Sequence, residues 1–232
     1  MSKPNGRERD KLGRPRHLDD ETERRKIMDA AVLVMARNGY GHMAVGDVLA
    51  EAQLSTTSFY RHFQSKDALL AAVIRRDGES AQRALQRAIA AAAGPVAALQ
   101  AWLDGLLDHF YEPRRAARTA LFTSPEVLSS LRMNSEIMEE MRSILCQPLV
   151  KVLRAGHRAG VLRSTKPEAD AVSLFALAST AATSPRGYPR DRNRARAHVL
   201  RFAWPALAIS GDPASSAQSS QRSRQPRKEH AS

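Results

Sequence analysis

The sequence predicts an all-α fold in which a small N-terminal helical domain is joined to a larger helical domain. Apolar residues recur at helical spacing from about residue 20 to residue 209. Alternating runs of β-branched residues, which would indicate strands, are absent, and aromatic residues make up only 5% of the chain. A length of 232 residues is enough for one large domain or for two unequal domains, and we expect two.

The two ends of the chain differ in composition from the rest. Residues 1–19 mix lysine and arginine with glycine and proline, and residues 211–232 are rich in serine, glutamine and arginine. Neither segment has enough apolar surface to fold alone, so we expect a disordered basic arm and a disordered tail. The domains expected between them are residues 20–77 and residues 78–210.

The first domain is predicted to begin with a helix whose N-cap is Asp20, with Glu23 in the capping-box position, and which ends at Asn38-Gly39. An apolar stripe spaced i, i+3, i+4, i+7 predicts a second helix over 45–52, and a third short helix is expected over about 56–62. Ser65 is the expected cap of a longer helix that runs toward residue 89. Two helices as short as the second and third need neighbours to pack against.

The second domain is predicted to contain helices over about 96–111, 114–122, 135–159, 168–183 and 191–209, with one more opened by Ser124 and Pro125. Pro148 is expected to bend the helix that contains it. Cys146 is the one cysteine of the chain, so no disulfide can form within it. Its apolar neighbours favour a packed, unreactive thiol over a redox sensor.

The chain is strongly basic: 36 Lys and Arg residues against 24 Asp and Glu residues give a net charge of +12. Such a charge favours an anionic partner, either nucleic acid or an acidic membrane surface. No run of 18 uncharged apolar residues is present, and no apolar stretch follows the charged N-terminus. We therefore expect a cytoplasmic protein that does not insert into a membrane.

The motifs of common enzyme classes are missing, among them the nucleophile elbow, the zinc-protease motif, the P-loop and the dinucleotide fingerprint. We therefore expect neither an enzyme nor a cofactor. Asp104, Asp108 and Glu112 recur every four residues beside His109, a stripe that could ligate a divalent metal. A solvated helix face explains the stripe better, because no converging ligands from other segments are evident.

The pattern most informative about function is Ser58-Phe59-Tyr60-Arg61-His62-Phe63 followed by Ser65-Lys66-Asp67. It is preceded at the expected distances by Asn38-Gly39-Tyr40 and Leu54-Ser55. With these features, residues 24–77 resemble the N-terminal domain of TetR-family transcription regulators. The resemblance implies a helix-turn-helix DNA-binding domain, a C-terminal domain for dimerisation and ligand binding, and a repressor as the usual function.

On this resemblance, the third helix enters the major groove of double-stranded operator DNA. The residues expected to contact DNA are Thr56, Thr57 and Ser58 at its start, Tyr60, Arg61 and His62 on its outward face, and Lys66, which matches a phosphate-contacting lysine of the family. Packing on the core is the alternative for Tyr60, and a surface imidazole without a role is the alternative for His62. In the arm, Arg14 and Arg16 either enter a narrow minor groove or belong to a solvated tail.

The segment departs from the family pattern at four positions. Met43-Ala44 stand where a Thr-Ser pair usually caps the second helix, which puts that cap and its phosphate contact in doubt. Gln53 replaces the turn glycine and must accept a left-handed backbone or reshape the turn. Thr57 replaces another glycine and is expected to alter the bases that are read.

For the second domain, the resemblance implies a homodimer and an effector. The helix after Glu168 presents Ala171, Ala178, Ala181 and Ala182, which permit close helix packing, and the last helix offers Val199, Phe202, Ala203 and Ala206; two such helices from each subunit are expected to form the interface. The candidates for a hydrophobic effector pocket, with ordinary core as the alternative, are Trp102, Leu106, Phe110, Phe122, Met138, Met141 and Phe175. Alternative functions are an architectural protein that binds DNA without sequence preference and a transcriptional activator.

Overall fold

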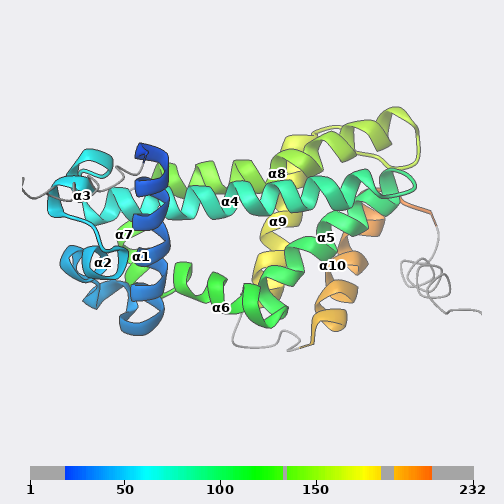
Figure 1. Ribbon diagram of the computed structural model, residues 1–232. Coiled ribbons are helices and arrows are strands. Elements are labelled where there is room, and N and C mark those ends of the chain that lie inside the picture. Colours follow the sequence, from blue (N-terminus) through cyan, green and yellow to red (C-terminus); the bar gives the residue numbers. More distant parts are fainter. Residues whose placement is uncertain (1–18, 133–134, 184–190, 211–232) are drawn as a thin grey trace, which may run out of the picture.

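The computed structural model describes residues 19–132, 135–183 and 191–210, which form ten α-helices and no strand (Figure 1). The helices are α1 (Asp20–His42), α2 (Val45–Ala52), α3 (Thr56–His62), α4 (Lys66–Ala90), α5 (Pro95–Tyr111), α6 (Pro113–Phe122), α7 (Pro125–Arg132), α8 (Ser135–Arg158), α9 (Pro167–Thr183) and α10 (Arg192–Ala206). The all-α prediction is therefore confirmed. None of these helices is both long and apolar enough to cross a lipid bilayer. The expected arm up to residue 18 and the expected tail lie outside the described residues.

Side-chain caps and prolines determine where several helices begin. The N-cap of α1 is Asp19, whose carboxylate accepts a hydrogen bond from the Thr22 backbone N–H at 2.8 Å, so the predicted cap at Asp20 is wrong by one residue. Ser65 caps α4 as predicted, accepting from the Ala68 N–H at 3.0 Å. Proline occupies the first position of α5, α6, α7 and α9, where its missing N–H costs no helical hydrogen bond.

The first hydrophobic core lies among α1, α2, α3 and the first half of α4 (Figure 1). Its fully buried members include Ile27, Val34, Val48, Phe59, Leu69 and Val73. Val127 of α7 and Ile137 of α8 belong to the same cluster, so helices from later in the chain complete it. The two short helices α2 and α3 are thus stabilised by packing against longer neighbours.

The second core lies where the last part of α4 packs with α5, α8, α9 and α10. Trp102 of α5 is buried there, and its indole N–H donates to the Leu145 carbonyl of α8 at 3.0 Å. Helix α4 belongs to both clusters, with Ile74 in the first and Leu85 in the second. The predicted domain boundary between residues 77 and 78 lies between Ile74 and Leu85, and it remains a prediction.

Cys146 of α8 is buried, and its Sγ lies 3.7 Å from the Ala171 carbonyl oxygen of α9. Burial raises the pKa of the thiol to about 11. The thiol therefore stays protonated at neutral pH, in the form that is a poor nucleophile. The expected packed thiol is confirmed.

Candidate DNA-binding surface and ligand cavity

The turn between α2 and α3 has the left-handed backbone that the sequence predicted at Gln53, with φ 55° and ψ 45°. The Gln53 N–H donates to the Ala50 carbonyl at 3.3 Å, and the Leu54 N–H donates to the Leu49 carbonyl at 3.1 Å. A non-glycine residue in this region costs roughly 1–2 kcal/mol. The turn keeps its helix-turn-helix form because these two hydrogen bonds and the buried flanking helices hold it.

The start of α2 lacks a side-chain cap, as expected from Ala44. Instead, the Asp47 carboxylate accepts a hydrogen bond from the Ala44 backbone N–H at 3.2 Å. Met43 is buried in the first core rather than exposed. The Met43-Ala44 pair therefore contributes to packing and offers no hydroxyl to a phosphate.

Helix α3 has one buried and one exposed face. Phe59 is 0% exposed and packs beside the buried Phe63, with their ring centroids 5.9 Å apart. The exposed residues of α3 are Thr56, Thr57, Tyr60 and Arg61. Tyr60 is 60% exposed, and its ring makes an edge-type contact with Phe59. The alternative in which Tyr60 packs into the core is therefore wrong.

The side chain of His62 does not lie on the outward face of α3, and this prediction was wrong. Only 7% of the side chain is exposed, and its Nε2 lies 3.3 Å from an Oε of the equally buried Glu23 in α1. Arg61 also contacts Glu23, at 3.3 Å, and pairs with Asp20 at 3.1 Å. These contacts attach α3 to the first turn of α1. A carboxylate of α1, 39 positions earlier in the chain, thus determines which way His62 points.

Ser58 is also buried, and its backbone N–H donates to the Ser55 hydroxyl at 3.2 Å. Its Oγ lies 3.2 Å from the Ser55 Oγ, so the predicted exposed hydroxyl is instead part of the N-cap of α3. The arginines at positions 14 and 16 lie outside the described residues.

Lys66 binds backbone carbonyl groups at the end of α1. Its Nζ donates to the Tyr40 carbonyl at 3.0 Å and to the Met43 carbonyl at 3.1 Å, and it lies 4.4 Å from the centre of the Tyr40 ring. The Tyr40 hydroxyl donates to Asp67, and burial together with this hydrogen bond raises the tyrosine pKa. Asp67 also accepts from Ser130 of α7 at 3.0 Å. The end of α1 is therefore fixed to α4 and α7.

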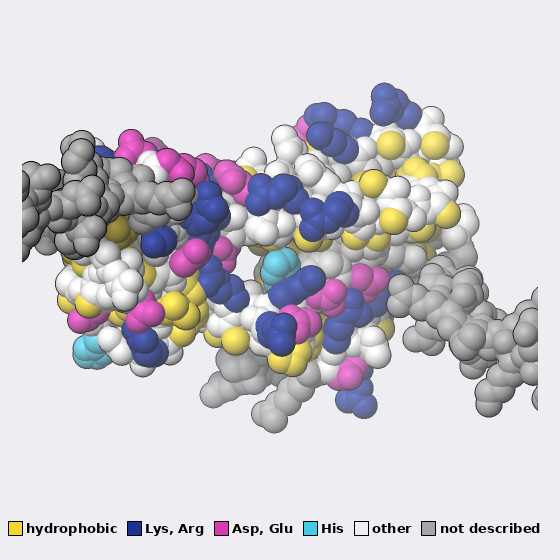
Figure 2. Space-filling model, in the orientation of Figure 1, with side chains coloured by type: hydrophobic (Ala, Val, Ile, Leu, Met, Phe, Trp, Pro, Cys, Tyr) yellow, Lys and Arg dark blue, Asp and Glu magenta, His cyan; other side chains and the backbone are white. Residues whose placement is uncertain are grey.

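Residues 19–77 contain nine acidic and eight basic side chains, a net charge of −1. Several of the basic side chains are paired within this unit, including Arg37 with Glu51 and Arg61 with Asp20. Acidic side chains lie beside basic ones over this unit, at the left of the view in Figure 2. The positive charge of the chain is therefore located elsewhere.

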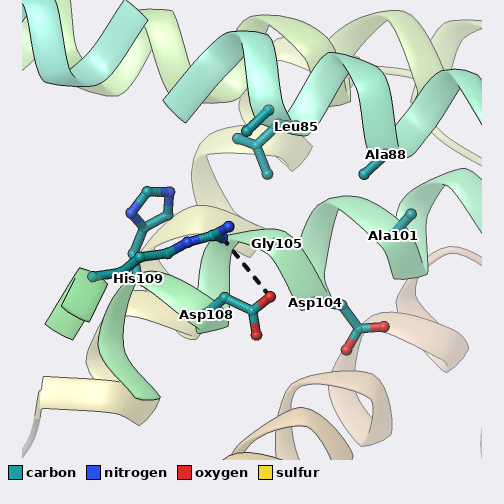
Figure 3. Close-up of a pocket in the computed structure, with 9 residues that line it drawn as sticks. Leu85, Ala88, Ala101, Asp104, Gly105, Asp108 and His109 are labelled. Carbon is teal, nitrogen blue, oxygen red and sulfur yellow. Dashed lines mark ion pairs between the residues drawn. The ribbon is translucent and has the colours of Figure 1, made fainter. Parts of the chain in front are cut away.

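A cavity of about 360 Å³ lies between α4, α5 and α6 (Figure 3). Small and apolar side chains of α4 and α5 form one part of its wall, and polar side chains of α5 and α6 form another. The lining residues are Ala84, Leu85, Ala88, Ala101, Asp104, Gly105, Asp108, His109 and Arg115. Its volume is in the range of small-molecule sites.

The two aspartates of the α5 stripe are about one third exposed, and both pair with arginines. Arg196 donates to Asp104 at 2.8 Å, and Arg192 donates to Asp108 at 2.6 Å, both from α10. The contact between Arg115 of α6 and Asp108 is longer, at 3.9 Å. The aspartates of α5 and the arginines at the start of α10 therefore form ion pairs with each other.

None of the seven predicted pocket residues lines this cavity. Trp102 and Leu106 are buried in the second core, Phe110 and Phe175 pack against it, Phe122 and Met141 pack against the first core, and Met138 is 44% exposed. These seven side chains do not converge on one site. The cavity is instead lined by Asp104, Asp108 and His109, among others. The spacing of these residues along α5 predicted a solvated helix face.

Most of the alanines expected at a dimer interface lie inside their own chain, although Ala182 is only partly buried and Ala206 is exposed. Ala171, Ala178 and Ala181 of α9 are buried, as are Val199 and Ala203 of α10. Their small size permits the close packing of α9 with its neighbours α8 and α10 rather than with a second subunit. Phe202 is different, because 51% of its surface is exposed.

Comparison with known proteins agrees with this geometry. The profile described as "Bacterial regulatory proteins, tetR family" matches residues 27–73, which include α2, α3 and the start of α4. A curated relative, the HTH-type transcriptional repressor LfrR of Mycolicibacterium smegmatis, is 30% identical over 129 residues. That alignment spans 52% of this chain and 64% of LfrR, less than two thirds of the relative.

Residues 27–73 therefore match the tetR family of bacterial regulatory proteins.

Solved structures share this helical fold over most of the chain. The structure of RolR in complex with resorcinol superposes with a TM-score of 0.58, at 18% identity, and the match covers 90% of this chain and 97% of RolR. The fatty acid degradation regulator FadR from Bacillus halodurans gives a TM-score of 0.60, at 16% identity, covering 80% of this chain and 94% of FadR. At these identities the comparison concerns the fold alone.

Proposed function

We propose that the protein is a sequence-specific DNA-binding transcriptional repressor that acts as a homodimer and leaves its operator when a small effector binds. The observation that supports this most strongly is the two-faced α3, whose buried Phe59 and Phe63 present an exposed polar face. The match of residues 27–73 to the tetR family and the repressor name of LfrR support the same function.

Direct contact with DNA is assigned to the exposed side chains of α3. Threonine hydroxyls and the Tyr60 hydroxyl can reach phosphates or base edges, and the Arg61 guanidinium matches the acceptors of guanine once it exchanges Asp20 for a base. Lys66 uses two of its three N–H donors on carbonyls, so one donor is left for a phosphate. Ser58 and His62 position α3 rather than touch DNA.

A helix of seven residues reads only a few base pairs, so one subunit binds weakly and a two-fold dimer is needed to address two half-sites about 34 Å apart. We assign the dimer contact to the outer faces of α9 and α10, where Phe202 is exposed. Replacement of Phe202 by glutamate is expected to shift the protein from dimer to monomer in size-exclusion chromatography with light scattering. An unchanged mass would place the interface elsewhere.

Helix α6 connects the cavity with the DNA-binding unit. Arg115 lines the cavity, and Arg118, one turn further along α6, donates to Asp77 of α4 at 2.5 and 3.0 Å. The neighbouring Arg76 pairs with Asp29 of α1 at 2.7 Å. An effector that displaces α6 therefore changes the tilt of α4 and with it the separation of the two α3 helices. Such an effector must bind the two states with different affinities.

A titration of fluorescent duplexes tests DNA recognition. A palindrome from upstream of the gene should bind at least a thousandfold more tightly than a random duplex at physiological salt. Equal binding would instead support the architectural alternative. Tyr60→Ala is expected to weaken operator binding about tenfold or more without changing the melting temperature, because Tyr60 is exposed.

A further inference from the structure

The charged side chains that line the cavity differ in how close their ion-pair partners are. Asp104 and Asp108 each accept a hydrogen bond within 2.8 Å from an arginine of α10. Arg115 has only long contacts, 3.9 Å to Asp108 and 4.0 Å to Glu112. The dashed line in Figure 3 marks the long ion pair that Asp108 makes at the cavity. Among the described charged side chains that line the cavity, the guanidinium of Arg115 is therefore the one without a short hydrogen bond, and its N–H donors are available.

His109 supplies a second polar group beside Arg115. Its ring has no hydrogen-bond partner among the described residues, although it is partly buried and lines the cavity. Burial and the nearby positive charge of Arg115 lower the pKa of His109, whereas Asp108 on the same helix and Asp77 of α4 act in the opposite direction. At neutral pH the ring is therefore uncharged and offers one N–H donor.

Another part of the cavity wall is apolar. It consists of Leu85 and the small residues Ala84, Ala88, Ala101 and Gly105. A Cβ on Gly105 would lie 2.7 Å from a methyl group of Leu85, so α4 and α5 approach closely at this point. A planar apolar group fits such a narrow space better than a bulky branched one.

We propose that this cavity binds a small organic monoanion, with a carboxylate on Arg115 and His109 and a planar apolar body against Leu85 and the alanines. The Arg115 guanidinium can bind a carboxylate through two parallel N–H donors. The two aspartates do not repel the anion strongly, because arginines of α10 already neutralise them. This inference rests on the proposed function for the role of the ligand as effector, but not for its binding.

Three probes of the same shape and different charge test the proposal: benzoate, the neutral benzamide and the cationic benzamidinium. Isothermal titration of the full-length protein should show benzoate binding at least tenfold more tightly than either of the others. Arg115→Gln should weaken benzoate binding at least tenfold. Arg114→Gln is the matched control, because Arg114 is exposed and does not line the cavity, and it should leave the affinity unchanged.

A second measurement uses pH. Because a bound carboxylate favours the protonated imidazole, benzoate affinity should rise several-fold between about pH 8 and pH 6, and this rise should disappear in His109→Gln. Melting temperatures of the variants show whether they remain folded.

Several results would overturn the proposal: no benzoate binding, equal binding of benzamide, tighter binding of benzamidinium, or benzoate binding that Arg115→Gln does not weaken. Operator binding without any probe is measured separately. Failure to bind the operator would therefore contradict the proposed function and leave the anion site standing.

Discussion

The DNA-binding unit and the body of the molecule distribute their charges differently. Residues 19–77 carry a net charge of −1, whereas residues 78–210 contain eleven acidic and eighteen basic side chains, a net charge of +7. On the face shown in Figure 2, many Lys and Arg side chains lie over the body. The total charge of +12 therefore does not describe the surface that meets DNA. On the proposed function, we expect the affinity for DNA to come from a few exposed groups of α3 and from the basic segment 1–18, which has six Lys and Arg residues.

The largest expected effect concerns the arm. Deleting residues 2–18 should lower operator affinity about a hundredfold at physiological salt and should reduce the slope of log affinity against log salt by about 2 or more, since fewer counterions are released. Fluorescence anisotropy over a series of salt concentrations measures both quantities.

The matched control for the arm lies on the body. Replacing Lys151, Arg158 and Lys166, all exposed near the end of α8, by glutamine should change neither quantity. If this triple variant weakened binding as much as the deletion, the contrast between the two regions would be wrong.

The next effect concerns the buried carboxylate of the DNA-binding unit. Glu23→Gln removes the charged acceptor that Arg61 and His62 share, and it should destabilise the protein by roughly 1–3 kcal/mol in urea unfolding. Glu21→Gln, on the same turn but exposed, should change stability by less than about 0.5 kcal/mol. Equal effects of the two changes would mean that Glu23 contributes no more than a surface carboxylate.

A smaller effect is expected from pH and the His109 ring in the body. The pKa of His109 in the folded protein is lowered, so the unfolded chain binds more protons below about pH 6.5. The stability contribution from the neutral ring is present above that pH and is lost as the pH falls toward the folded-state pKa. Melting temperatures between about pH 8 and pH 5.5 should decline less in His109→Gln than in the unmodified protein. An identical decline would assign the pH dependence to other groups.

The smallest effect is expected from the ion pairs of α5 with α10. Asp104 is one third exposed, so Asp104→Asn should cost only about 0.2–1 kcal/mol of stability, and the loss should shrink in 1 M salt because solvent ions screen such a pair. A larger, salt-independent loss would indicate that the pair is effectively buried.

Local chemistry in the sequence was enough to predict the elements and much of the turn geometry. Helical periodicity predicted the helices, Ser65 caps α4 as its residue type favours, and Gln53 accepts the left-handed backbone, one of the two outcomes expected for it. The direction of His62 was not predictable in this way, because it depends on Glu23 of another helix. For the same reason, the spacing of Asp104 and Asp108 suggested a solvated face, although their partners are arginines about 85–90 residues later.

The pocket residues were harder to predict because burial and ligand contact select similar side chains. Trp102 and Leu106 are of residue types that line pockets. The same residue types are also common in hydrophobic cores, and both side chains are buried in the core. The cavity instead borders on Gly105 and alanines, whose small size leaves space. An absence of side-chain volume is difficult to recognise before the neighbouring helix is placed.

Because α4 is long, a small tilt at one end of the helix moves its other end over a larger distance. From Leu85 at the cavity to Lys66 beside α3, the helix rises about 28 Å at 1.5 Å per residue. A rotation of about 7° around its cavity end would therefore move the other end by about 3.4 Å, the rise of one base pair in DNA. Two subunits that rotate in opposite senses would double that change. A tilt of a few degrees at the cavity would then change the separation of the two α3 helices by more than the rise of one base pair.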